Sequence, residues 1–140
     1  MLSFGEKIDG VIYKDLPCAR GIFKNEKGEF GFVNVNGQYF LVGGGIEAGE
    51  TPEQAVVREF REEIGAEIKI GKKIGEAEDY LFGKKEEAYF RKIQTFFVVE
   101  IIGEIKGGIE DNHELVWATI DSVEPFILQK SQAWAVRQTL

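Results

Sequence analysis

The chain has 140 residues, a formal net charge of −7 and 44% hydrophobic residues, which predicts one domain with a single core. We do not expect an acidic chain without a basic cluster to bind the backbone of nucleic acids, because phosphate contacts require Lys and Arg on one face. No apolar run is long enough to span a bilayer, so we expect no membrane partner. Cys18 is the sole cysteine, and the N-terminal segment lacks signal-peptide features. We therefore expect a cytoplasmic protein.

Strand and turn signals alternate regularly before residue 43. Apolar segments at 18–23, 30–35 and 38–42 are typical of strands, and a charged turn separates the first two. Asn36 and Gly37 form a tight-turn signal between the last two. This pattern predicts an antiparallel meander that leads into a run of three glycines.

Residues 52–64 carry the signals of an amphipathic helix. Thr51 is a typical N-cap, Pro52 suits the first helical position, and Gln54 completes a capping box. Apolar residues then recur at spacings of three and four, which predicts a stripe facing the core. They are Val56, Val57, Phe60 and Ile64. Gly65 is a typical stop signal.

A different face of this helix carries Glu59, Glu62 and Glu63 within one turn of each other. On charge alone they indicate a solvent-exposed face, with Arg58 and Arg61 relieving the repulsion. That interpretation leaves the glycines on both sides of the helix unexplained, and glycines indicate close backbone approach. Magnesium takes carboxylate oxygens, water and substrate phosphates as ligands. The three carboxylates therefore suit a hard divalent cation.

Two long strands are predicted after the helix, at 67–83 and 88–103, joined as a hairpin. In the second strand, Phe96 and Phe97 point to opposite faces, so both faces of the sheet are expected to be partly buried. A further strand is predicted at 115–120. The chain ends in a predicted amphipathic helix over 125–140, whose apolar residues include Phe126, Ile127, Ala133, Trp134 and Val136.

The segment around the first helix resembles the Nudix box of MutT-like hydrolases. The matching positions are Gly44, Glu50, Arg58, Glu59, Glu62, Glu63 and Gly65. Two positions depart from the usual pattern, because Ala66 replaces a bulky aliphatic residue and Val42 replaces a proline. The resemblance implies one Nudix domain over residues 1–140, with an α/β/α sandwich in which a mixed sheet lies between the box helix and the C-terminal helix.

The resemblance also implies a role for each matching residue. Glu59, Glu62 and Glu63 would bind magnesium or manganese, together with the backbone carbonyl of Gly43. Arg58 would orient the glutamates. Glu50 would support Arg58, while Gly44 and Gly65 would shape the backbone around them. The implied reaction is hydrolysis of a nucleoside diphosphate linked to another moiety, by attack of water on phosphorus.

Two positions are candidates for the general base. Glu63 is the candidate within the box. Outside it, an acidic segment that contains Glu110, Asp111 and Glu114 precedes a predicted strand, and a loop there would bring a carboxylate to the metals. His113, the only histidine, has three open interpretations, namely a surface residue without a role, a titrating base or a substrate contact.

The substrate is less constrained by the sequence. Tyr80 and Phe82 are candidates for stacking on a base, although core packing is the simpler explanation for such aromatics. A nucleoside triphosphate, a dinucleoside polyphosphate and a nucleotide sugar all remain open. The oligomeric state is open as well, and a homodimer is one of the alternatives. The alternatives are a non-catalytic nucleotide-binding regulator on the same fold and an isoprenoid diphosphate isomerase, which would need a catalytic cysteine that Cys18 does not obviously supply.

Overall fold

The computed structural model describes residues 1–108 and 112–140, and a five-stranded mixed sheet forms its centre. The strands run in the order β1 (Leu2–Phe4), β6 (Glu67–Gly83), β7 (Ala88–Ile102), β2 (Lys14–Ile22) and β5 (Val42–Gly45). The hairpin of β6 and β7 is antiparallel, whereas β2 runs parallel to β7 and β1 runs parallel to β6. The mixed sheet agrees with the prediction. The short strand β1 was not expected from the sequence.

A second sheet in the described chain contains β4 (Gln38–Phe40), β3 (Phe30–Val35) and β8 (His113–Ala118), all antiparallel. The predicted strand 38–42 is therefore divided between two sheets. The chain leaves one sheet and enters the other at Leu41, which is buried between them. This crossing places β5, with its three glycines at residues 43–45, beside β2.

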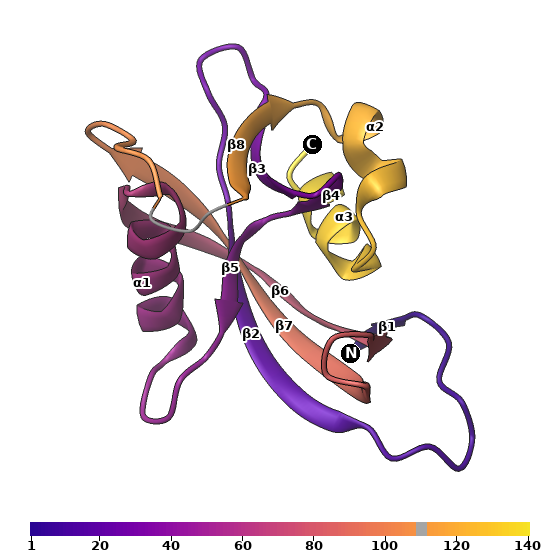
Figure 1. Ribbon diagram of the computed structural model, residues 1–140. Helices are drawn as coiled ribbons and strands as arrows, with labels where there is room; N and C mark the ends of the chain where they lie inside the picture. Colours follow the sequence, from indigo (N-terminus) through magenta and orange to yellow (C-terminus); the bar gives the residue numbers. More distant parts are fainter. Residues whose placement is uncertain (109–111) are drawn as a thin grey trace.

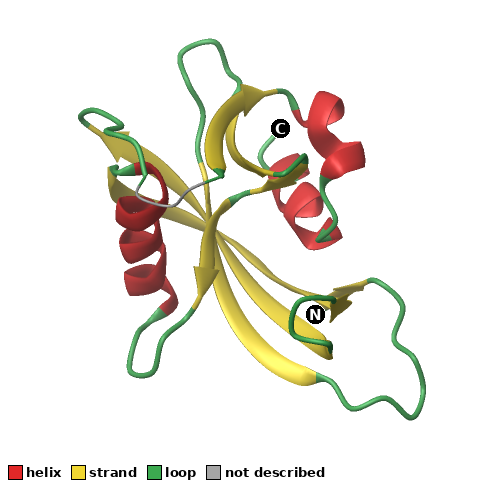
Figure 2. Ribbon diagram, viewed as in Figure 1, coloured by secondary structure: helices red, strands yellow, loops and turns green. Residues whose placement is uncertain are grey.

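Helices cover both faces of the central sheet (Figures 1 and 2). Helix α1 (Pro52–Ile64) packs on one face, while α3 (Lys130–Arg137) lies on the other side together with α2 (Ile120–Val123) and the 3-10 turn η1 (Glu124–Phe126). None of the helices in the described part of the chain is long and apolar enough to cross a membrane.

The single long helix predicted for residues 125–140 is wrong in extent. An extended segment at Ile127–Gln129 separates η1 from α3. This break turns Ile127 into the core, where it is fully buried, and leaves Phe126 52% exposed. Burial of Ile127 outweighs the continuation of the helix. The strand predicted at 115–120 instead spans His113–Ala118, and Ile120 belongs to α2.

Two apolar clusters hold the helices to the sheet. On one side, Val56, Phe60 and Ile64 of α1 pack with Phe97 of β7. On the other, residues of α3 pack with Phe96, which confirms the predicted alternation along β7. Helix α1 lies close to β2, since a Cβ built on Gly21 would lie 2.4 Å from Cε1 of Phe60.

Candidate active site

Helix α1 begins and ends as predicted. The hydroxyl of Thr51 accepts a hydrogen bond from the backbone N–H of Gln54 at 3.1 Å, and the Gln54 side chain accepts from the Thr51 N–H at 2.9 Å. Gly65 adopts the left-handed conformation, with φ of 62°, that ends the helix. These caps set the rotation of the helix, and with it the direction of its glutamates.

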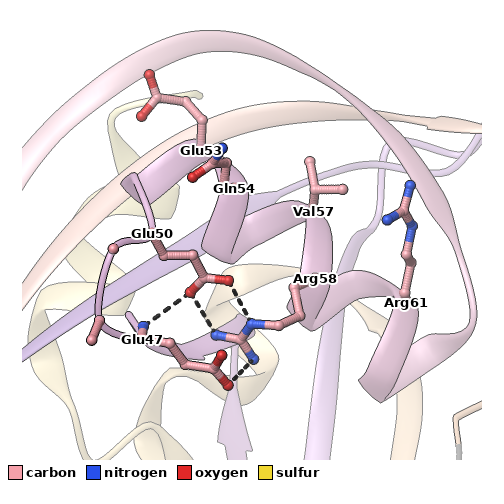
Figure 3. A pocket seen from close by; sticks show the side chains of 9 residues that line it. Glu47, Glu50, Glu53, Gln54, Val57, Arg58 and Arg61 are labelled. Atoms are coloured by element: carbon pink, nitrogen blue, oxygen red, sulfur yellow. Dashed lines mark hydrogen bonds and ion pairs between the residues drawn. The ribbon is translucent and has the colours of Figure 1, made fainter.

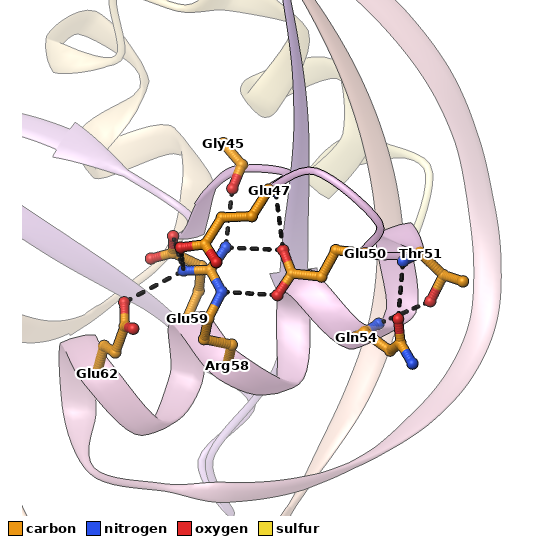
Figure 4. A network of polar contacts seen from close by, with 8 residues as sticks. All are labelled: Gly45, Glu47, Glu50, Thr51, Gln54, Arg58, Glu59 and Glu62. Carbon is orange, nitrogen blue, oxygen red and sulfur yellow. Dashed lines mark hydrogen bonds and ion pairs between the residues drawn. The ribbon is translucent and has the colours of Figure 1, made fainter.

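Arg58 is the centre of a network of polar contacts on α1 (Figure 4). Its Nε and Nη2 donate to the two carboxylate oxygens of Glu50 at 2.7 and 2.9 Å, a bidentate pair. Nη2 also donates to the carbonyl of Gly45 at 2.9 Å. Nη1 donates to Glu59 at 3.0 Å and to Glu62 at 3.2 Å. One guanidinium therefore holds two of the three glutamates on the ridge.

Arg61 does not share this role, although its charge made it a candidate partner for the glutamates. Its Nε donates to Glu67 at 2.8 Å, at the start of β6. Figure 3 shows the open hollow between α1 and the loop before it, where Glu50 and Arg58 point toward each other and Arg61 stands apart. Of the two arginines, Arg58 is therefore the one that relieves the repulsion between the ridge carboxylates.

The network shifts the acidities of its members. The hydrogen bond from Arg58, supported by the backbone N–H of Glu47, lowers the pKa of Glu50 to about 2. Glu50 in turn raises the pKa of Arg58, which stays cationic. Burial raises the pKa of Glu59, and the hydrogen bond from Arg58 opposes this shift. The Arg58 guanidinium therefore stabilises the ionised form of Glu59 against the effect of burial.

The glycines before the loop bring backbone against Glu59. A Cβ on Gly44 would lie 2.7 Å from Oε1 of Glu59. Gly43 has a φ of 152°, and a Cβ there would lie 2.1 Å from the carbonyl oxygen of Ala19. Only glycine fits at either position without movement of its neighbours. The predicted close approach of backbone to the carboxylates is therefore present.

Glu63 faces a separate cavity of about 260 Å³ that extends between the two sheets. Its lining residues come from α1 and from the strands β2, β3, β4, β5 and β8. The lining residues are Arg20, Val33, Val35, Phe40, Gly43, Glu63 and His113. Arg20 was not expected at this site from the sequence, although a charged residue inside the apolar segment 18–23 was a visible signal.

The donor groups around α1 suit a hard divalent cation in their chemistry. Carboxylates of Glu59, Glu62 and Glu63 and the carbonyl of Gly43 are oxygen ligands of the kind that magnesium prefers. Within residues 1–108 and 112–140, no three His, Cys, Asp or Glu side chains already form a metal-binding group. Arg58 contacts two of these carboxylates instead. The metal assignment therefore rests on donor type and on the approach of Gly44 to Glu59.

The structure places Glu114 in a strand, and not in the loop that the sequence suggested. Glu114 is exposed and lies opposite Asn34 in the pairing of β8 with β3. It lines a hollow of about 300 Å³ beside the Asn36–Gly37 turn and does not line the cavity at Glu63. His113, its neighbour, lines both. Glu110 and Asp111 lie outside the described residues.

Tyr80 and Phe82 lie in the distal half of β6, in an aromatic group with Tyr13 and Tyr89. The ring centroids of Tyr80 and Tyr13 are 5.0 Å apart, and those of Phe82 and Tyr89 are 4.9 Å apart. The hydroxyl of Tyr80 donates to Glu78 at 3.2 Å. Neither residue lines the cavity at Glu63. Their contact with a substrate base stays a prediction.

Comparison with known proteins matches residues 18–138 to the model of the NUDIX domain. The NAD-capped RNA hydrolase NudC of Pseudomonas aeruginosa is 32% identical over 100 residues, which cover 71% of this chain and 33% of that protein. The 8-oxo-dGTP diphosphatase of Haemophilus influenzae is 38% identical over 100 residues, which cover 65% of this chain and 68% of that protein. This chain matches about a third of the length of NudC.

The solved structure of a MutT protein from Methanosarcina mazei Go1 superimposes with a TM-score of 0.72. Sequence identity is 20%, and the match covers 91% of this chain and 94% of the other. This likeness confirms the expected fold, a mixed sheet between helices.

Proposed function

Because the chain belongs to the NUDIX family, we propose that it is a pyrophosphohydrolase that depends on a divalent cation. Its substrate would be a nucleotide-derived small molecule in which a nucleoside diphosphate is linked to another group. Water would attack phosphorus and break the diphosphate bond. The observation that carries this proposal is the arrangement of Glu59, which is held by Arg58 and packed against Gly44.

Glu59, Glu62, Glu63 and the carbonyl of Gly43 are the proposed ligands of magnesium or manganese. When bound, such a cation neutralises diphosphate charge and lowers the pKa of water. Arg58 would orient the carboxylates of Glu59 and Glu62, since one of its nitrogens contacts both. Glu50 would hold Arg58 through the bidentate pair. Loss of such supporting contacts typically costs about 10- to 100-fold in metal affinity or activity.

Glu63 is the proposed general base, which accepts the proton of the attacking water. Glu63 shares a cavity with Gly43, whereas Glu114 is exposed on β8 and faces another hollow. A base must lie within hydrogen-bond reach of the proton that it removes, directly or through one water. The common cavity therefore favours Glu63 over Glu114.

The test is a screen of nucleoside triphosphates, dinucleoside polyphosphates and nucleotide sugars with magnesium or manganese in oxygen-18-labelled water. We expect label in one phosphate product, and no turnover when a chelator is present. Glu62→Gln should abolish most turnover, whereas Glu53→Gln, on the exposed first turn of the same helix, should not. Undiminished turnover by Glu62→Gln would contradict the metal assignment.

The competing function is that of a nucleotide-binding regulator without catalysis. Retention of all three ridge glutamates, two of which contact Arg58, disfavours it, because a binding module has no need of a cation that activates water. Tight binding of a nucleotide by the wild-type protein, with no turnover of any compound in the screen, would establish the regulator instead.

A further inference from the structure

A buried polar network links the α3 side of the central sheet to the backbone just before the carboxylate ridge. Its members come from β2, β6, β7 and the segment that begins α3. They are Arg20, Asp79, Gln94, Gln129, Ser131 and Gln132, and each is at most 7% exposed. Burial of polar side chains is costly unless every group finds a partner. Such a network therefore holds its members in one arrangement.

One end of the network contacts the backbone just before the box. Nη1 of Arg20 donates to the carbonyl oxygens of Leu41 at 3.0 Å and Gly43 at 3.2 Å. The side chain of Gln132 accepts from the N–H of Leu41 at 2.6 Å. The strand from Leu41 to Gly43 is thus held by side chains from two distant parts of the chain.

The other end anchors Arg20 to α3. Nε of Arg20 donates to Gln94 at 3.0 Å, and Nε2 of Gln94 donates to Asp79 at 2.5 Å and to Ser131 at 3.0 Å. The backbone N–H of Ser131 donates to the other oxygen of Asp79 at 3.0 Å. Arg20 therefore has little freedom to rotate.

The contact at Gly43 leaves that carbonyl able to serve a second partner. A carbonyl oxygen has two lone pairs, so it can accept from Arg20 and still face a cation. Arg20, Gly43 and Glu63 line the same cavity. Gly44, the next residue, packs against Glu59. The position of the Gly43 carbonyl thus sets the distance between the backbone and the glutamates.

We propose that Arg20 is a positioning residue, which fixes the Gly43 carbonyl and the Gly44 backbone against the glutamate ridge. This inference rests on the proposed function, since it concerns the metal site of the same reaction. It assigns a role to the α3 side of the molecule, where Gln94 and Gln132 hold the strand that precedes the box.

Charge and position make opposite predictions for removal of Arg20. A positive charge near a cation site weakens metal binding by Coulomb repulsion, so loss of the charge alone would tighten it. Loss of positioning would weaken it. Arg20→Lys keeps the positive charge and loses the planar arrangement of guanidinium N–H donors. Arg20→Met loses the charge and the donors. Gln94→Leu keeps Arg20 and removes the acceptor of its Nε.

The experiment is a Mn²⁺ titration of the wild type and the three variants, followed by paramagnetic broadening of amide NMR signals, with kcat and KM measured in parallel. The spectra and thermal melts show which variants fold. We expect each folded variant to bind Mn²⁺ about 10- to 100-fold more weakly, with a lower kcat and little change in KM. Arg137→Met, at a surface ion pair with Glu124, is the matched control and should match the wild type.

Tighter Mn²⁺ binding by Arg20→Met would overturn the inference in favour of a charge effect. A raised KM with unchanged Mn²⁺ binding would overturn it in favour of direct contact with substrate. If all folded variants match the wild type in both readouts, Arg20 has no role at the site. A wild-type protein that binds no Mn²⁺ and turns over no substrate refutes the proposed function itself. Failure of the positioning role and failure of the proposed function are distinguishable, because the variants test the positioning role only when the wild type is active.

Discussion

The molecule contains two networks centred on arginine, and they differ in partners and in access to water. Arg58 donates hydrogen bonds to three carboxylates and one carbonyl at a partly exposed surface, where 42% of the Glu62 side chain is accessible. A fourth carboxylate, that of Glu47, forms an ion pair with its Nη1 at 3.6 Å. Arg20 contacts two carbonyls and one amide in the interior. A surface network of charges can exchange one cation for another at modest cost. A buried network cannot change its contacts at such a modest cost, because any broken hydrogen bond leaves a polar group unsatisfied.

This difference suggests a division of work. The Arg58 network is suited to change its contacts when a metal and substrate arrive, since Arg58 already occupies the oxygens that a metal would bind. The Arg20 network is suited to keep the backbone of Gly43 and Gly44 in place while that exchange occurs. We therefore expect substitutions in the Arg58 network to reduce function with little loss of stability. Substitutions in the Arg20 network should also destabilise the fold.

Substitution of the proposed base should have the largest effect. Glu63→Gln keeps the size of the side chain and removes its basicity, so we expect turnover to fall by about 10²- to 10⁴-fold. Glu114→Gln is the matched comparison on β8 and should change turnover little. Steady-state kinetics with the best substrate of the screen measure both. A large loss in Glu114→Gln alone would transfer the role to Glu114.

Removal of Arg58 should affect function much more than stability. Arg58→Met releases Glu59 and Glu62, and we expect activity and Mn²⁺ affinity to fall by about 10- to 100-fold. The melting temperature should change by only a few degrees, because water reaches this network. Calorimetry and kinetics on the same preparation compare the two losses. Unfolding of this variant would show that Arg58 is a structural residue.

Disruption of the buried network should, unlike removal of Arg58, also lower the stability of the fold. Asp79 accepts hydrogen bonds from the side chain of Gln94 and from the backbone and hydroxyl of Ser131. Asp79→Asn replaces one acceptor with a donor that meets other donors, and we expect a loss of about 1–3 kcal/mol in the free energy of unfolding. Chemical denaturation measures it. Asp121→Asn, an exposed partner of Arg137, serves as the control.

Gly44→Ala should affect the metal site with little effect on the fold. The added Cβ would lie 2.7 Å from Oε1 of Glu59, and the flexible carboxylate can move away. We expect a roughly tenfold weaker affinity for Mn²⁺ and a nearly unchanged melting temperature. Gly45→Ala, where a Cβ meets open space, is the control. Equal affinity in the two variants would mean that the Gly44 contact does not affect the site.

The smallest expected effect concerns pH. The pKa of Glu50 falls from its usual 4.5 to about 2 in the folded protein, so the contact with Arg58 stabilises the fold fully above pH 4.5. That contribution is lost as pH falls toward 2. Glu50→Gln lacks it at every pH. The difference in melting temperature between wild type and variant should therefore shrink on acidification. A difference that does not vary with pH would contradict the ion pair.

Much of the fold was readable from the sequence because its signals are local. The caps at Thr51 and Gly65 and the apolar stripe on α1 predicted the helix bounds, and alternation predicted the two faces of β7. The C-terminal helix was predicted too long because its apolar pattern continues through Ile127 and Leu128. Only the burial of Ile127 and the polar contacts of Gln129 show why the helix breaks there.

The sequence by itself determined the Arg58 network and the presence of the Nudix box. Its members are separated by one, four, eight and thirteen residues, distances that a helix and one preceding loop bridge on their own. The tertiary structure alone decided the Arg20 network, whose contacts join residues 21, 74 and 91 positions apart. Hydrogen bonds carry no periodic signature along a chain, so only the pairing of strands and the docking of α3 reveal which buried side chains meet. The same pairing decided that His113, and not Glu114, lines the cavity at Glu63.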